Sequence, residues 1–254
     1  MKKLVLGCLL VLGTVFLFNA CSKDSKDDPI STTSSTSSTS TSSSTSNSGT
    51  SSGNGSGSSS GSGSNTTTGV GVVINGVKWA TRNVATSGTF ATNSYDVGMF
   101  YQWNSKVGWP STGTVTGWNS NWTGGYTNPS STDTWTSTND PSPTGYRVPT
   151  YAEIQTLLDT TKVTHTWTTQ NSVNGEKFTD KTTGNSIFLP ASGYRLCYDG
   201  TLHNMGSYGY YWSSSAYGSG YAYGLPYLLY FASFFAYWDE NSRSTGFSVR
   251  PVVE

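Results

Sequence analysis

The residue types that carry most enzyme chemistry are scarce in this chain. Its two histidines, His165 and His203, stand outside any nucleophile or metal-ligand spacing. Cys8 and Cys21 lie in an N-terminal segment discussed below, and Cys197 by itself supplies neither an internal disulfide nor a cysteine-pair metal site. We therefore expect no catalytic residue, no cofactor and no enzyme activity in the mature protein.

One trio of oxygen-bearing side chains has the chemistry of a cation site. Asp239, Glu240 and Asn241 carry the hard oxygen ligands that Ca²⁺ requires. The trio follows Trp238 in what we expect to be a loop, so a solvated turn is the simpler interpretation. We predict no metal site.

The charged residues are few and balanced. From residue 70 onward the chain carries ten basic and eleven acidic residues. Nucleic acid is therefore an unsuitable partner, because binding it requires a basic face. Arg147, Arg195 and Arg250 are candidates for anion binding, but we expect their guanidinium groups to pair with acids or brace loop carbonyls.

An uncharged aromatic segment over 208–238 is the strongest candidate for recognition. Tyr, Ser, Gly, Ala and Phe fill almost every position of it. Tyr offers a large rigid surface at low entropic cost, and Ser and Gly add adaptable hydrogen bonding. The alternative is that these are ordinary core aromatics of strands. Both interpretations can be correct at once, because successive residues of a strand point alternately into the core and to the outside.

Residues 1–20 have the plan of a secretory signal peptide. Two lysines precede an apolar run over 4–18, and small residues follow before Cys21. The letters FNAC ending at Cys21 resemble a bacterial lipobox, in which the cysteine becomes the lipidated first residue. Phe18 stands where Leu is usual, which leaves cleavage at a neighbouring site open. We expect Cys21 to carry the lipid.

Two segments follow before the folded domain. Residues 21–30 form the lipidated N-terminus, and their Lys and Asp cluster is similar to the lipoprotein export signal of Bacteroidetes, which directs proteins to the outer face of the outer membrane. Residues 31–69 are only Ser, Thr, Asn and Gly, so we expect a disordered tether. The domain itself occupies 70–254.

Local patterns predict the elements that position the candidate residues. Asn75 and Gly76 between two apolar runs predict a hairpin. Thr150 after a proline, with Glu153 three residues on, predicts a capped helix over 150–159. With few helices among many strands, the expected class is α+β. Strands are expected at 100–103, 178–180, 187–189, 210–213, 225–231 and 247–253, with Leu228 and Tyr230 on one face of their strand and Leu225, Tyr227, Leu229 and Phe231 on the other.

Seven short motifs follow one another along the domain, and each occurs once. They are VKWATRNV (77–84), GTFA (88–91), YQW (101–103), GYRVPTYAEIQTLL (145–158), FLPASGYR (188–195), YYWSSSAY (210–217) and GFSVRPV (246–252). Together they resemble the Fibrobacter succinogenes major paralogous domain family, which has many members on Bacteroidetes surfaces.

This resemblance implies a fold similar to the C-type lectin-like and formylglycine-generating-enzyme-like domains. It implies a twisted antiparallel sheet, few short helices and long loops, with the 210–213 and 247–252 strands near the centre. The oxidase branch of that superfamily uses a cysteine pair, or a copper site made by one, which Cys197 alone does not provide.

The segment between those two strands then supplies the exposed loops, 214–224 and 232–243. Some C-type lectin-like proteins have such loops diversified by retroelements that turn Asn codons into Tyr, Ser, Gly and Phe codons; the composition is compatible with this history, but ordinary family members are also rich in Tyr and Ser. The ligand-binding residues we expect are Tyr217, Tyr221, Tyr223, Phe234, Phe235, Tyr237, Trp238, Asn241 and Arg243.

The sequence thus predicts a surface-tethered, adhesin-like module that binds a glycan or a protein, because aromatic residues serve both. Two alternatives stay open. One is a structural part of a surface assembly such as a pilus tip or a polysaccharide-uptake complex. The other is an enzyme on the oxidase-like fold.

Overall fold

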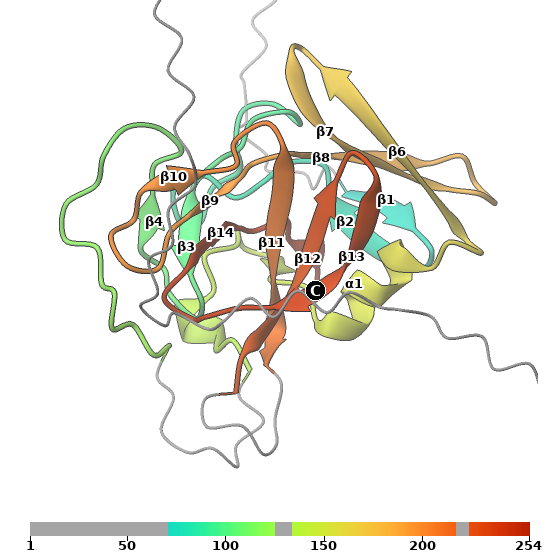
Figure 1. Cartoon of the computed structure of the whole chain (residues 1–254). Coiled ribbons are helices and arrows are strands. Elements are labelled where there is room, and N and C mark those ends of the chain that lie inside the picture. Colours follow the sequence, from blue (N-terminus) through green and yellow to red (C-terminus); the bar gives the residue numbers. More distant parts are fainter. Residues whose placement is uncertain (1–70, 125–133, 217–223) are drawn as a thin grey trace, which may run out of the picture. The chain divides into compact units, whose positions relative to one another are not determined.

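Strands dominate the structure, a computed structural model that describes residues 71–124, 134–216 and 224–254. Strand residues make up 42% of it, and the described part contains one α-helix of eight residues beside a single 3-10 turn, Ser137–Asn139 (Figure 1). The expected α+β, C-type lectin-like class is therefore wrong, and the domain is mostly β. The segments expected to be a signal peptide, an export signal and a tether, together with Cys21, lie outside the described residues.

The N-terminal hairpin belongs to a four-stranded sheet of order β1-β2-β15-β5. Asn75 and Gly76 form its turn with φ of 44° and 84°, the left-handed pair that a two-residue hairpin requires. The predicted hairpin is confirmed. The strands are β1 (Gly71–Ile74), β2 (Val77–Ala80), β5 (Tyr146–Arg147) and β15 (Val252–Val253).

The largest sheet has eight strands and the main path β10-β9-β14-β11-β12-β13, with β3 and β4 attached beside β14. β11 pairs in parallel with β14 and antiparallel with β12, so the expected central position of β11 is confirmed. The expected single strand over 247–252 is wrong, because this range is divided between β14 and β15 of the four-stranded sheet. The strands are β3 (Phe100–Gln102), β4 (Gly108–Trp109), β9 (Tyr194–Arg195), β10 (Leu202–His203), β11 (Tyr208–Ala216), β12 (Pro226–Ala232), β13 (Phe235–Glu240) and β14 (Gly246–Ser248).

The third sheet and the helix complete the described fold. β6 (Val163–Gln170), β7 (Val173–Asp180) and β8 (Ser186–Pro190) pair antiparallel in sequence order. The helix α1 (Tyr151–Leu158) has the predicted capping box: the Thr150 side chain accepts a hydrogen bond from Glu153 N, and Glu153 accepts one from Thr150 N. Ile154 and Leu157 are its buried residues.

Two hydrophobic clusters lie on the two faces of β11 and β12. In the first, residues from all three sheets and α1 meet, and the second lies on the opposite face. The predicted split within 225–231 is confirmed for its buried members, because consecutive strand residues point to opposite faces. Tyr211, Leu229 and Phe231 belong to the first cluster, and Trp212, Leu228 and Tyr230 to the second.

Candidate functional site

The second cluster is only partly covered, and its outer part is a row of aromatic side chains on the eight-stranded sheet. We call this row the aromatic face. Five of its members are half-buried or exposed, and Tyr230 is buried beneath them. They come from β9, β11, β12 and β13; the last three are neighbours in the sheet, and β14 lies between β9 and β11. The aromatic face consists of Tyr194, Tyr208, Tyr210, Tyr230, Phe235 and Tyr237.

Strand alternation on β11 places two tyrosines on this face. Tyr208 and Tyr210 point outward because the residues between and after them, Gly209 and Tyr211, point to the first cluster. A Cβ on Gly209 would lie 2.0 Å from the Phe231 ring, so glycine at this position leaves room for that ring to lie against β11 on the side of the first cluster.

Cross-strand stacking makes the row continuous. The Tyr210 ring stacks on Tyr230 with 4.8 Å between centroids, and on Phe247 of β14 at 5.1 Å. Tyr230 lies opposite Tyr237 in the register, and the two rings meet edge to face at 5.1 Å. At the other end, Tyr194 packs edge-on against Tyr210. The rings thus connect four strands.

The stacked rings cover one another's faces. The ring planes of Tyr208 and Tyr230 are 13° apart, and those of Tyr210 and Phe247 are 11° apart. The surface therefore presents ring edges and hydroxyl groups in place of open aromatic planes. Such a surface is amphipathic and suited to both apolar contact and hydrogen bonding.

The hydroxyl groups of Tyr210 and Tyr230 are neutral at physiological pH. Burial raises the pKa of Tyr210 above its ordinary value and that of Tyr230 to about 12. Each hydroxyl can therefore donate one hydrogen bond and accept others. The Tyr210 oxygen accepts one from Asn204 Nδ2 at 3.3 Å. Asp239, on the same face of β13, is the nearby acid, and burial raises its pKa too.

A tight turn carries one more ring beyond the sheet. Ala232 pairs with Phe235, which leaves Ser233 and Phe234 as a two-residue hairpin loop. The Phe234 side chain is 80% exposed and contacts the Phe235 ring edge to face at 4.8 Å. A large apolar side chain this exposed at a hairpin tip is a candidate anchor for a partner.

The structure brings together some of the expected site residues and separates others. Phe235 and Tyr237 lie on the aromatic face, with Phe234 beside them. The predicted loop over 232–243 is wrong, because half of it is strand β13. Trp238 consequently points to the opposite side. Tyr217, Tyr221 and Tyr223 lie outside the described residues.

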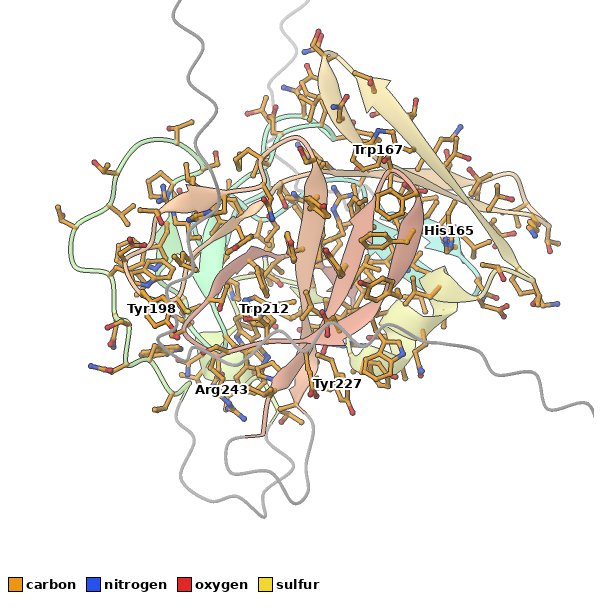
Figure 2. The ribbon with its side chains drawn as sticks, in the orientation of Figure 1. His165, Trp167, Tyr198, Trp212, Tyr227 and Arg243 are labelled. Carbon is orange, nitrogen blue, oxygen red and sulfur yellow. The ribbon has the colours of Figure 1, made fainter. Side chains whose placement is uncertain are left out.

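On that opposite side, Trp238 joins two tyrosines. It packs edge-on against Tyr151 of α1 at 5.3 Å and Tyr227 of β12 at 5.5 Å, and these two rings stack on each other at 4.0 Å. Figure 2 shows Tyr227 at the lower end of the sheet, well below Trp167. Trp238 is therefore not part of the aromatic face.

Two expected ligand-binding residues instead hold the chain together. Arg243 is 5% exposed, lies over the Trp103 ring at 4.3 Å and donates to the Gly224 carbonyl at 2.8 Å. The Asn241 side-chain oxygen accepts hydrogen bonds from Ser242 N and Thr245 Oγ1. Neither side chain reaches the aromatic face.

Sequence reasoning missed four members of the face. Tyr210 and Tyr230 lie in predicted strands, and neither they nor Tyr194 and Tyr208 are among the ligand-binding residues that the sequence predicts. A signal was present for two of them, because Tyr208 and Tyr210 flank a glycine with the spacing of one strand face. Nothing local distinguishes Tyr230 from its buried neighbours.

The residues considered for chemistry do not converge. No group of three His, Cys, Asp or Glu side chains able to hold a metal occurs among the described residues. Asp239 and Glu240 are consecutive on a strand, so their side chains point to opposite faces. β6 and β10, which carry His165 and His203, lie on opposite sides of the molecule in Figure 1.

Cys197 differs from its expectation, because it is disulfide-bonded in the structure.

The three arginines have the structural roles expected of them. Arg147 forms an ion pair with Glu153 at 2.6 Å. Buried Arg195 donates to loop carbonyls, and buried Arg250 donates to Asn83 Oδ1 at 2.8 Å. The carbonyls that Arg195 braces belong to Pro110, Thr112, Gly113 and Gly200.

The comparisons give no function. Residues 162–252 match a family model described as Domain of unknown function (DUF8237), so the chain is similar to that family over β6 to β15 and thus over the whole aromatic face. Neither the curated proteins nor the solved structures contain a match. Within the described ranges, no helix has the length and apolar character needed to cross a membrane.

Proposed function

We propose that the protein is a surface-displayed lipoprotein of the Fibrobacter succinogenes major paralogous domain family whose β-rich domain binds an extracellular ligand through the aromatic face. The observation that carries this proposal is the continuous row of outward tyrosines, which ends at the exposed Phe234. Tyr is enriched among the residues that dominate binding energy because it combines large apolar area with a hydrogen-bonding tip.

The form of the face favours a protein ligand over a glycan. Sugar rings bind to open aromatic planes, whereas here the planes of Tyr208, Tyr210 and Tyr230 are stacked on one another. Ring edges, neutral hydroxyls and a projecting Phe234 suit a protein surface, where such groups fill pockets and pair with backbone polar atoms.

The test is binding of the full-length protein to an array of extracellular proteins and, in parallel, to a glycan array. The informative variant is Tyr208→Ser combined with Phe234→Ser, since both rings contribute outward surface. The matched control is Tyr198→Ser, an exposed tyrosine at the far left of Figure 2, away from β12 and β13.

We expect binding on the protein array that the double variant weakens by about tenfold or more, as for loss of a central anchor. The Tyr198→Ser protein should bind as wild type does. Binding to glycans alone would refute the protein preference, and a double variant that binds every hit like wild type would refute the aromatic face as the site.

A further inference from the structure

β13 is the outer strand of the largest sheet, and no described strand pairs with its outer edge. The strand order ends at β13, and its register with β12 runs without a shift from Tyr227 opposite Glu240 to Ala232 opposite Phe235. Natural proteins protect such edges with charged residues, Pro, a bulge or a covering helix. Residues 235–238 carry no charge, Pro or bulge, whereas Asp239 and Glu240 lie at the far end of the strand and Tyr151 of α1 packs against Trp238.

Backbone groups on this edge are positioned to receive another strand. Asn241 N donates to Pro226 O at 3.1 Å, which continues the ladder with β12. Because the direction of these groups alternates along an antiparallel strand, the N–H and C=O groups of Ala236 and Trp238 point away from β12. These four groups have no hydrogen-bond partner among the described residues.

The side chains beside this edge are exposed on both faces of the sheet. Tyr237 is 43% exposed on the aromatic face, and Trp238 is 44% exposed on the other. A strand added to β13 would cover part of both rings, since cross-strand neighbours lie only about 5 Å apart.

We propose that β13 pairs antiparallel with β13 of a second copy of this chain, about a two-fold axis at Tyr237. In this register Tyr237 lies opposite its own equivalent, in a non-hydrogen-bonded pair, where side chains approach most closely. Ala236 of each copy lies opposite Trp238 of the other, so a small side chain faces a large one. The outward groups of those two residues form four hydrogen bonds across the axis.

Charge favours a second copy in this arrangement. The antiparallel register places Asp239 opposite Phe235 of the other copy, whereas a parallel in-register pair would place each Asp239 against its equivalent. From residue 70 onward, ten basic residues nearly balance eleven acidic ones, so two domains repel each other little over distance. A self-complementary patch of this kind is what a two-fold interface requires.

The pairing has a consequence that rests on the proposed function. A two-fold axis normal to the sheet turns the aromatic faces of both copies to the same side. The ligand then meets two adjacent copies of the site, and a bivalent ligand is held more tightly than by either site alone.

Cysteine cross-linking of the full-length lipoprotein on intact cells tests the pairing without any ligand. Tyr237→Cys places two thiols across the axis at a separation that a disulfide accepts. We expect most of this variant to run as a dimer under non-reducing conditions. Phe234→Cys is more exposed but off the axis, and Val73→Cys lies on the edge strand of another sheet; both should stay at the wild-type background.

Sedimentation of the detergent-solubilised full-length protein provides the second measurement. The wild type should sediment as a dimer, and Ala236→Pro, which removes one outward N–H per copy, should raise the dissociation constant by about tenfold or more. A monomeric wild type, or a Tyr237→Cys protein that cross-links no more than Phe234→Cys, overturns the proposal. Neither outcome bears on ligand binding, which the Tyr208 and Phe234 variants test separately.

Discussion

Glu176 is a buried carboxyl on β7 without an ionic partner in the described structure. It is 4% exposed and lies between Trp167 and Leu189 in the sheet register. The ion pair of the described residues, Arg147 with Glu153, does not involve it. Burial raises the pKa of Glu176 from 4.5 to about 7, because the charged form is poorly solvated there.

This raised pKa makes stability depend on pH. Glu176 ionises near pH 4.5 in the unfolded chain and only near pH 7 in the folded chain. The folded state therefore loses stability as the pH rises from about 4.5 to about 7, and Glu176 causes no further loss at higher pH. The loss between pH 5 and pH 8 is about 2 to 3 kcal/mol. Glu176→Gln should remove this part of the pH dependence of the free energy of unfolding.

Urea unfolding of the wild type, Glu176→Gln and the exposed control Glu254→Gln, measured at pH 5 and pH 8, checks this. The control should follow the wild type at both pH values. If Glu176→Gln loses as much stability as the wild type does between them, Glu176 is ionised in the folded protein and the interpretation is wrong.

Arg243 illustrates how little a residue type says about exposure. Its charge and its place after the aromatic segment indicated ligand binding, yet the guanidinium lies over the Trp103 ring and holds Gly224. Trp103 precedes it by 140 positions in the chain, so no local pattern relates the two residues. Burial of an arginine depends on a partner that only the fold supplies.

At the scale of elements, the helix α1 depends on its first turn. Thr150 Oγ1 accepts from Glu153 N at 3.2 Å, and Glu153 also binds Arg147, which joins the helix start to β5. Thr150→Ala leaves the Glu153 N–H without this partner and should cost about 1 kcal/mol of stability. Thr160→Ala, just beyond the helix and exposed, is the matched control.

Chemical denaturation measures both changes. Equal midpoints for Thr150→Ala and Thr160→Ala would show that the capping box contributes nothing to stability. A loss well above 2 kcal/mol would show that Thr150 also maintains the contact between Glu153 and Arg147.

For the whole molecule, the proposed attachment to the membrane depends on a single residue. Cys21→Ala removes the sulfur to which we propose that the lipid is attached, and the protein should move from the membrane fraction to the soluble fraction. Cys8→Ala, within the proposed signal peptide, should leave the protein in the membrane fraction. Intact-mass spectrometry should find the acyl mass on wild type and Cys8→Ala alone. Retention of Cys21→Ala in washed membranes would exclude lipid attachment at this position.

Several elements follow from the sequence because their causes are local. The hairpin turn at Asn75 and Gly76 needs two residues that accept positive φ, and the helix start needs Thr150 with Glu153. The apolar strands could be placed for the same reason. The fold class could not be predicted in this way. β13 is a strand because it pairs with β12, and the sequence of this segment led us to expect a loop.

The sequence by itself determined an uncharged, tyrosine-rich C-terminal segment and the strands that run through it. Only the tertiary structure decided which rings meet. Tyr194, Tyr210, Tyr230 and Tyr237 come from four strands, and the register of those strands stacks them in one row. Both faces of β12 are apolar. The alternation of side chains along the strand assigns each residue to a face, but it does not show which face is covered by the rest of the fold. That choice belongs to the packing of distant segments.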